Sequence, residues 1–245
     1  EQAGVTHPGA ALEIVVFDLD GTLVDTADDF IPVVQQLREE YALPPLEPAR
    51  IRRSVSNGSR ALVSLALGLE PGQPAHDVAR ARLLELYGAI LGRHARLYPG
   101  MAALLGQLEA RGIAWGIATN KPRAYTLPLL EGLGLQPAPG AVLCPDDVTQ
   151  PKPHPESLLR ICAALGRRPG RGIYAGDHLR DIEAGRRAGT YTIAAAYGYI
   201  EERDDPARWD ADALAADSEQ LAALIIGPAA GPGAGQRAGA GGSSE

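Results

Sequence analysis

The sequence predicts an α/β fold, with a doubly wound parallel sheet and an inserted all-helical segment. From Gly100 onward, short apolar runs alternate with helical patterns, which is typical of a parallel sheet built from strand–helix–strand units. Residues 26–95 show helical periodicity and no strand pattern. An acidic turn, Asp18–Gly21, directly follows the first apolar run. The sequence therefore predicts an acidic turn at the end of the first strand and a helical block directly after this turn.

The first strand is predicted over the apolar run at residues 12–16, just before Phe17. A β-branched run of this kind forms a strand that is buried on both faces of a parallel sheet. Because ligands bind at the carboxyl ends of the strands in open α/β sheets, the acidic turn is expected at a ligand-binding edge. Gly21 allows a sharp turn there and, with Thr22, offers backbone N–H groups to an anion.

The helical block is expected to begin with Thr26 as its N-cap, with Asp28 and Asp29 in the first turn, where they suit the helix dipole. A loop, Ser56–Arg60, is predicted within the block. A helical insertion directly after the first strand is expected to form a cap. Asp25 is interpreted as a hinge or capping carboxylate, and the alternative is a direct chemical role. Its helices are predicted over residues 26–41, 48–54, 61–67 and 75–94.

The remaining strands are predicted over four apolar runs, at residues 113–118, 141–143, 172–175 and 191–194. The polar start and the low-complexity end of the chain are expected to be flexible, because neither can bury enough apolar surface. The predicted division is therefore a Rossmann-like core over residues 11–25 and 96–226, a helical cap over 26–95, and flexible ends at 1–10 and 227–245.

The composition is globular, with 45% hydrophobic and 22% charged residues, and the net charge of −7 argues against general nucleic-acid binding. No run approaches the roughly 18 apolar residues of a membrane helix, and the N-terminus lacks a signal-peptide pattern. A cytoplasmic protein with no nucleic-acid or membrane partner is expected. Cys144 and Cys162 lack a metal-like spacing and are interpreted as free thiols, with a structural disulfide as the alternative.

Four polar clusters are expected at the carboxyl ends of the predicted strands. Asp18 and Asp20, two residues apart at a strand end, suit a nucleophile paired with a general acid/base, and the alternative is a solvated acidic turn. Thr119, supported by the backbone N–H of Asn120, suits a phosphate contact, and the alternative is an ordinary N-cap. Lys152, one of only two lysines, is flanked by prolines, so a rigid ammonium could offset the charge of a phosphoryl group.

The fourth cluster is Gly176–Asp181. If a helix starts here, Asp177 and Asp181 face the same way, and these hard oxygen ligands suit Mg²⁺. The alternative is helix capping plus an exposed carboxylate. In a parallel sheet, the carboxyl ends of the strands would gather all four clusters around Asp18.

In this order and spacing, the four clusters resemble the four motifs of the haloacid dehalogenase superfamily, most of whose members are Mg²⁺-dependent phosphatases. The resemblance covers roughly residues 12–225 and implies a phosphomonoester hydrolase. It implies that Asp18 is the nucleophile, which forms an aspartyl-phosphate, and that Asp20 is the general acid/base. Thr119, Asn120 and Lys152 would then hold the phosphoryl group.

The same resemblance implies that Mg²⁺ is held by Asp18, the backbone carbonyl of Asp20 and Asp177, with Asp181 orienting its waters or Lys152. Two histidines depart from the expected motifs. His178 follows the Gly-Asp pair where a small or acidic residue is expected, and His154 stands where an Asp is expected. Both are interpreted as neutral imidazoles rather than metal ligands.

Several phrases further resemble the branch of bacterial N-acetylmuramic acid 6-phosphate phosphatases of peptidoglycan recycling, close relatives of phosphoglycolate phosphatases. The phrases are Thr119–Pro122, Leu143–Val148, Asp177–Gly185, and Tyr197–Ile200 followed by Trp209. This resemblance implies N-acetylmuramic acid 6-phosphate as substrate, with 2-phosphoglycolate as the nearest alternative. A sugar phosphomutase and a non-catalytic binding protein are more remote alternatives.

Two other activities of the superfamily are disfavoured. Residues 26–95 contain no lysine, which a phosphonatase would need for a Schiff base, and a dehalogenase would not need the acid Asp20. Within the cap, the loop residues Ser56, Asn57, Gly58 and Arg60 are candidates for substrate contact, because a bidentate guanidinium could bind a substrate carboxylate. The alternative is an ordinary loop with a solvated Arg60. The expected partner is a small phosphorylated metabolite, and the oligomeric state is left open.

Overall fold

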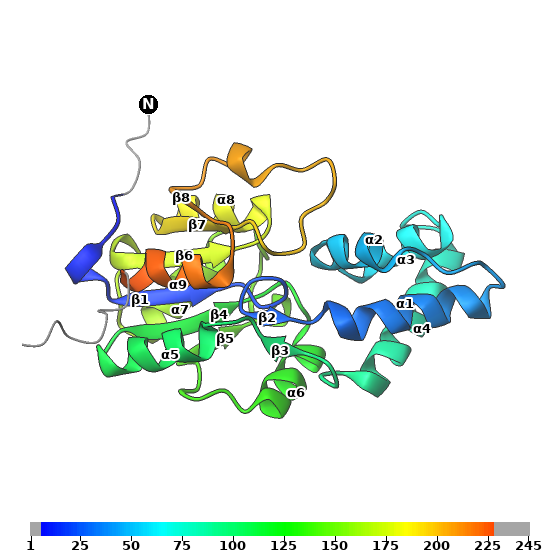
Figure 1. Ribbon diagram of the computed structural model, residues 1–245, viewed down its shortest axis with the longest axis horizontal. Coiled ribbons are helices and arrows are strands. Elements are labelled where there is room, and N and C mark those ends of the chain that lie inside the picture. The colour runs from blue at the N-terminus through cyan, green and yellow to red at the C-terminus, as the bar shows by residue number, and fades with distance from the viewer. Residues whose placement is uncertain (1–5, 228–245) are drawn as a thin grey trace, which may run out of the picture.

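A computed structural model describes residues 6–227 and contains a six-stranded sheet in the order β5-β4-β1-β6-β7-β8. Every neighbouring pair of strands is parallel, and β1 pairs with both β4 and β6, so that Val16 lies opposite Gly116 and Tyr174. The predicted α/β fold with a doubly wound parallel sheet is confirmed (Figure 1). The strands are β1 (Ile14–Phe17), β4 (Ala114–Ala118), β5 (Ala141–Leu143), β6 (Gly172–Gly176), β7 (Tyr191–Ala195) and β8 (Ala213–Ala215).

Helices cover both faces of the sheet, because successive residues of β1 point to opposite sides. Val15 and Phe17 pack in one hydrophobic cluster with residues of α5 (Met101–Ala110), α6 (Arg123–Leu133) and α9 (Ser218–Ile226). Ile14 and Val16 pack in another cluster with residues of α7 (Glu156–Ala164) and α8 (Leu179–Ala188). All four β1 residues are buried, which confirms the predicted central strand.

The inserted helices form a group of their own beside the sheet, with β2 (Val24–Asp25) and β3 (Arg96–Leu97) between the two groups (Figure 1). These helices are α1 (Ala27–Glu40), α2 (Pro48–Arg53), α3 (Gly58–Leu67) and α4 (Pro74–Ile90). They bury a separate hydrophobic cluster that includes Phe30, Val34, Leu37, Leu62, Leu83 and Tyr87. β2 and β3 pair antiparallel, so the chain leaves the sheet and returns to it through one short ribbon. The domain boundaries at 25/26 and 95/96 stay a prediction.

Two local details differ from the expectations, and three short strands were not predicted. Thr26 stands at the N-cap position of α1, as expected. Its hydroxyl, however, donates to Asp20 Oδ1 at 2.6 Å and makes no capping hydrogen bond. The predicted loop Ser56–Arg60 is instead the end of a 3₁₀ turn, η2 (Val55–Asn57), followed directly by the first turn of α3. Strands β2, β3 and β8 were not predicted from the sequence, because two or three residues carry no readable periodicity.

The described part of the N-terminal segment is packed against the sheet domain. Residues 9–11 form a 3₁₀ turn, η1 (Gly9–Ala11), and His7 Nε2 lies 2.9 Å from the carbonyl oxygen of Leu224 in α9. The rest of the expected flexible ends, residues 1–5 and 228–245, lies outside the described residues. The remaining 3₁₀ turns are η3 (Pro145–Asp147), η4 (Pro169–Arg171) and η5 (Pro206–Arg208).

Two other expectations concern cysteines and membrane helices. Cys144 and Cys162 are both buried free thiols, as expected, and the alternative of a disulfide between them is wrong. Between residues 6 and 227, each helix is too short or too polar to span a bilayer.

Candidate active site

The carboxyl ends of three neighbouring strands hold the predicted chemical residues. Asp18 follows β1, Thr119 follows β4, and Asp177 follows β6. Because these strands are parallel and adjacent, their ends meet at one edge of the sheet. A cavity of about 280 Å³ opens there between the sheet edge and the inserted helices. Its lining includes the predicted residues Asp18, Asp20, Thr119, Asn120, Lys152, Ser56, Asn57, Gly58 and Arg60.

The turn after β1 is a tight, buried loop. The carbonyl oxygen of Leu19 accepts from the N–H groups of Leu23 and Val24, and the N–H of Gly21 donates to the carbonyl oxygen of Val24. Gly21 has a φ of +82°, and a Cβ atom at this position would lie 2.1 Å from Asp177 Oδ2. Glycine is therefore needed both for the backbone conformation and for the close approach of Asp177.

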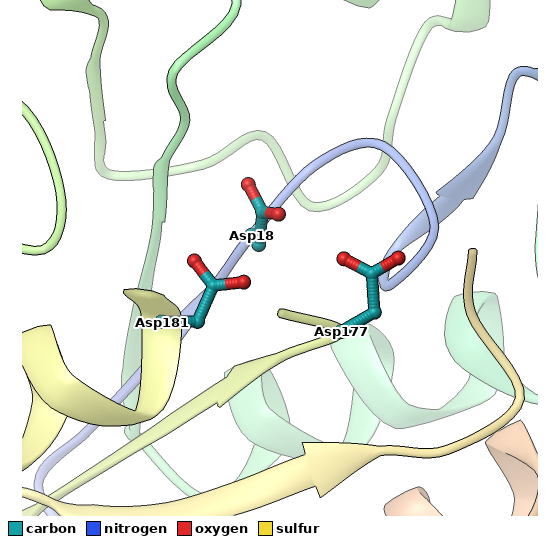
Figure 2. Close-up of side chains that lie close together, drawn as sticks. All are labelled: Asp18, Asp177 and Asp181. Carbon is teal, nitrogen blue, oxygen red and sulfur yellow. The ribbon is translucent and has the colours of Figure 1, made fainter. Parts of the chain in front are cut away.

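Three buried carboxylates lie together at the centre of this edge. Figure 2 shows Asp18 after β1, Asp177 after β6 and Asp181 in α8, with their carboxyl groups close to one another. One oxygen of each lies within 4.8 Å of one oxygen of the others, and each residue is at most 5% exposed. Burial, followed by the charge of Asp181, raises the pKa of Asp18 to about 6. Burial, followed by the charges of Asp18 and Asp181, raises the pKa of Asp177 to about 8.

Lys152 is the one ammonium bonded to this cluster within residues 6–227. Its Nζ donates to Asp18 Oδ1 at 2.8 Å and to the carbonyl oxygen of Ala118 at 2.8 Å, and lies 2.8 Å from Asp181 Oδ1. Burial alone would lower its pKa, but the charges of Asp18 and Asp181 outweigh burial and raise the pKa of Lys152. Lys152 is therefore a fixed cation beside Asp18, and this one ammonium contacts two of the three carboxylates, Asp18 and Asp181.

Two features of the carboxylate cluster suit a divalent cation: its excess of negative charge, and an oxygen atom of Asp177 without a hydrogen-bond partner. Asp177 Oδ1 is buried and accepts no hydrogen bond from any of residues 6–227. An unpaired buried carboxylate oxygen is costly, and hard oxygen ligands are those that Mg²⁺ prefers. Asp18 and Asp177 therefore suit such an ion, together with the backbone carbonyl of Asp20 in the turn between them.

Asp181 combines a structural and an electrostatic contact. Its Oδ2 accepts from the N–H of His178 and caps α8, whereas its Oδ1 lies beside Lys152 and accepts from the hydroxyl of Tyr174. Burial would raise its pKa, but the charges of Lys152 and Arg180 prevail and lower the pKa of Asp181. The alternative prediction for this cluster was helix capping plus an exposed carboxylate. Its first part is confirmed for Asp181, but its second part is wrong, because Asp181 is fully buried.

The two histidines that depart from the expected motifs have local partners. His178 Nδ1 accepts from the N–H of Arg180, and its Nε2 lies 3.1 Å from Asn57 Oδ1, which is consistent with a neutral ring protonated on Nε2. Burial, followed by the charge of Arg180, lowers the pKa of His178. His154 Nδ1 accepts from the N–H of Glu156 in the turn before α7.

Thr119 and Asn120 organise the backbone beside Lys152. Thr119 Oγ1 accepts from the N–H of Lys121 at 3.0 Å. The side-chain amide of Asn120 donates to the carbonyl oxygen of Lys152 at 3.1 Å and accepts from its N–H at 3.2 Å. This two-way contact fixes the segment that carries the ammonium relative to the end of β4.

Asp20 has a cationic partner that the sequence did not assign to the site. Lys121 Nζ donates to Asp20 Oδ1 at 3.0 Å and lies 5.0 Å from the ring centre of Phe30 and 4.7 Å from that of Tyr87. Within residues 6–227, the hydrogen bonds to the Asp20 side chain from Thr26 and Lys121 both fall on Oδ1. Two signals in the sequence pointed to this residue: the scarcity of lysine, and its place in the phrase Thr119–Pro122 that carried the resemblance. Other residues that line the cavity were also missed, among them Arg80, Arg180 and Tyr125.

Asp25 holds the junction between the sheet and the inserted helices. Its Oδ1 accepts from the hydroxyl of Tyr199, whose oxygen also accepts from the N–H groups of Thr26 and Ala27, and its Oδ2 accepts from Arg52 at 2.6 Å. These contacts agree with the hinge interpretation of Asp25. Tyr199 lies in one of the phrases that carried the resemblance to a branch of the superfamily.

Comparison with known proteins gives consistent matches. A profile described as haloacid dehalogenase-like hydrolase matches residues 15–195. An N-acetylmuramic acid 6-phosphate phosphatase of Pseudomonas aeruginosa is 43% identical over 210 residues, 86% of this chain and 93% of that protein. A phosphoglycolate phosphatase of Xanthomonas campestris pv. campestris is 38% identical over 207 residues, 84% of this chain and 93% of that protein.

The fold is also similar to that of solved structures. A crystal structure from Haemophilus somnus 129pt, described as a predicted phosphoglycolate phosphatase, matches with a TM-score of 0.76 at 25% identity. The match covers 86% of this chain and 96% of that chain. Since the family profile spans more than half of the chain and the relatives align over most of it, the chain belongs to the haloacid dehalogenase-like hydrolase family.

Proposed function

We propose that the chain is a Mg²⁺-dependent phosphatase that hydrolyses a small phosphate ester through an aspartyl-phosphate at Asp18. The observation that carries this proposal is the position of Asp18 in the cavity wall, bonded to a buried ammonium and beside a carboxylate oxygen that lacks a partner among residues 6–227. A carboxylate can approach a phosphate dianion only where cations offset the charge of both groups. Membership of the hydrolase family and the phosphatase relatives support the same reaction.

In this proposal, Asp18 attacks phosphorus in line with the leaving oxygen of the ester. Asp20 protonates that oxygen as it leaves, and the resulting carboxylate then removes a proton from the water that hydrolyses the aspartyl-phosphate. Lys152, the hydroxyl of Thr119 and the backbone N–H of Asn120 hold the phosphoryl oxygens. Lys121 and Thr26 orient Asp20 through its Oδ1.

The ion would be held by Asp18, Asp177 and the backbone carbonyl of Asp20, with Asp181 beside them. When bound, Mg²⁺ supplies positive charge that offsets the developing charge on the phosphoryl oxygens. Asp181 and Asp18 together keep Lys152 in place, since Lys152 Nζ lies 2.8 Å from an oxygen of each.

The substrate that we favour is N-acetylmuramic acid 6-phosphate, which is the ester named for relatives from Pseudomonas aeruginosa and Pseudomonas putida at 43% and 40% identity. The helical segment over residues 26–95 would act as a cap and bring Asn57, Gly58 and Arg60 to the outer part of the cavity. The exposed Arg60 guanidinium would meet the lactyl carboxylate of the substrate. The Ser56 hydroxyl points to Asp177 instead.

The second candidate substrate is 2-phosphoglycolate, which is favoured by relatives such as the Xanthomonas protein at 38% identity. It carries a carboxylate too, so the same Arg60 contact would serve. Phosphate release from the two esters, measured side by side with Mg²⁺ and with Asp18→Asn as the control, distinguishes them. Higher kcat/KM for the muramic ester supports our assignment, whereas higher kcat/KM for phosphoglycolate overturns the substrate only.

Two further outcomes address the remote alternatives. Transfer of the phosphoryl group to another position of a sugar phosphate, without release of phosphate, would identify a phosphomutase. Turnover of neither ester, with binding retained, would leave a non-catalytic binding protein. A cytoplasmic location stays a prediction from the sequence.

A further inference from the structure

One hydroxyl of the inserted helical segment reaches the carboxylate cluster. Ser56, in the turn η2 (Val55–Asn57), is 9% exposed, and its hydroxyl donates to Asp177 Oδ2 at 2.8 Å. The backbone N–H of Tyr199 donates to the same oxygen, also at 2.8 Å. Oδ2 is therefore paired twice, whereas Oδ1 has no partner among residues 6–227. The two oxygens of one carboxylate thus have different surroundings.

This difference sets the orientation of Asp177. Two donors on Oδ2, one from the inserted segment and one from the loop that carries Tyr199, hold the carboxylate in place and leave Oδ1 as its unpaired oxygen. The backbone also encloses this side chain, since a Cβ atom at Gly198 would lie 2.3 Å from Asp177 Cβ. Groups that hydrogen-bond to a metal ligand in this way orient it and raise the affinity of the site.

Ser56 is itself held by contacts that join the inserted segment to the sheet domain. Arg180 Nη2 donates to the carbonyl oxygen of Ser56. The Asn57 amide donates to Glu201 Oε1 at 2.7 Å, and the Ser54 hydroxyl donates to the same oxygen at 2.8 Å. These contacts exist only while η2 lies against the start of α8 and the loop that carries Glu201.

We propose that Ser56 is a positioning residue for the cation site, so that docking of η2 and Mg²⁺ binding favour each other. This inference rests on the Mg²⁺ site of the proposed function. When η2 leaves, Asp177 Oδ2 loses one of its two donors and the carboxylate is less well oriented for the ion. By thermodynamic linkage, the factor by which docking tightens Mg²⁺ binding is also the factor by which Mg²⁺ stabilises docking.

The test is the Kd for Mg²⁺ of the full-length chain without substrate, measured by isothermal titration calorimetry. Ser56→Ala removes the donor to Asp177 with a minimal change of volume and is expected to raise the Kd about tenfold or more. Ser59→Ala is the matched control from the same stretch, since the Ser59 hydroxyl accepts from Arg80 Nε rather than contacting Asp177. Its Kd is expected to equal that of the unsubstituted chain. Thermal unfolding in EDTA checks that both variants are folded.

A second variant keeps the hydroxyl and weakens docking. Asn57→Ala removes the contacts with Glu201 and His178 but leaves Ser56 in place, so a smaller rise in the Kd is expected. Hydrogen exchange of residues 55–60 should slow on addition of Mg²⁺ in the unsubstituted chain, and slow less in Ser56→Ala. This readout does not depend on turnover.

The outcomes separate the two proposals. If the unsubstituted chain binds Mg²⁺ and Ser56→Ala binds it with the same Kd, the positioning role of Ser56 is overturned and the phosphatase proposal stands. If the unsubstituted chain binds no Mg²⁺, both the metal site and the role of Ser56 are overturned. A raised Kd in Ser56→Ala with an unchanged Ser59→Ala supports the inference.

Discussion

The two walls of the cavity are built differently. On the sheet side, Asp18, Thr119 and Lys152 are 4–5% exposed, and each is fixed by hydrogen bonds to neighbouring strands or loops. On the helical side, Gly58 and Arg60 are exposed and lie at the start of α3. The sheet wall is thus a preorganised charge arrangement, whereas the start of α3 in the helical wall presents the exposed side chain of Arg60.

The difference between the two walls suits two tasks, which are catalysis at phosphorus and recognition of the rest of the substrate. Groups that act on phosphorus must be oriented before the substrate arrives, because reorienting them during the reaction would cost free energy. Groups that recognise the rest of the substrate can complete their contacts on binding. The comparison predicts that substitutions in the sheet wall lower kcat, and that those in the helical wall mainly raise KM.

The largest effect is expected from Asp18→Asn, which removes the nucleophile and keeps the shape of the side chain. A loss of kcat of at least about 10⁴-fold is expected, as for other covalent catalysts that lose their nucleophile. The rate of phosphate release from the preferred ester measures this loss. A melting temperature equal to or higher than that of the unsubstituted chain shows that the fold is intact. Residual turnover within tenfold of the unsubstituted chain would mean that Asp18 is not the nucleophile.

Lys152→Met is expected to lower both activity and stability. The loss of the ammonium should reduce kcat about 10²–10³-fold, because it removes charge stabilisation at the phosphoryl group. It also leaves Asp18 and Asp181 buried without their cation, which typically costs about 3–5 kcal/mol. Urea unfolding measures the change in the free energy of unfolding. A variant as stable as the unsubstituted chain would show that the ammonium does not offset the buried carboxylates.

Lys121→Met tests the orientation of Asp20. Loss of the Lys121 contact should allow the carboxyl group to shift, and a displacement on the order of 1 Å can cost up to about 10²-fold in kcat. The loss should be larger for a sugar phosphate, whose alkoxide must be protonated, than for p-nitrophenyl phosphate, which has a good leaving group. Equal losses for the two esters would argue against a role in acid catalysis.

Metal removal should make the stability of the chain depend on pH. The pKa of Asp177 is about 8 in the folded chain and about 4 in an unfolded one. The folded state therefore keeps a proton that the unfolded state has lost, and stability in EDTA falls as the pH rises from about 4 to 8. Melting temperatures at pH 5 and pH 8 in EDTA measure this fall, which Asp177→Asn should reduce. Mg²⁺ should reduce it as well, because it takes the place of the proton. A fall of the same size in Asp177→Asn would assign it to other groups.

Arg60→Ala should have the smallest effect. The exposed guanidinium is expected to contribute about 1.4 kcal/mol to the binding of a substrate carboxylate, so KM should rise about tenfold with little change in kcat. A phosphate ester without a carboxylate, such as glucose 6-phosphate, is the matched control and should show no rise. An equal rise for both esters would contradict a carboxylate contact.

The sequence by itself was sufficient to locate the strands that carry chemistry and to predict that they are parallel, whereas their order in the sheet came from the structure. Continuous apolar runs such as β1, followed by Asp18 and the tight turn at Gly21, can be recognised in the sequence because burial on both faces demands consecutive apolar residues. The helical block was readable for a similar reason, since its apolar residues recur at helical spacing. Parallel strands then bring the residues at their carboxyl ends together, whatever the loop lengths between them.

Only the tertiary structure decided which partners these residues have. Thr26 bonds Asp20 instead of capping α1, because the hinge turns its hydroxyl back toward the sheet edge. Lys121 lies against Phe30 and Tyr87, which come from two separate helices. Ser56 and Asp177 are 121 residues apart in the chain. Local sequence specifies spacing and burial, but a hydrogen bond between distant segments depends on how the inserted helices pack against the sheet, which periodicity does not encode.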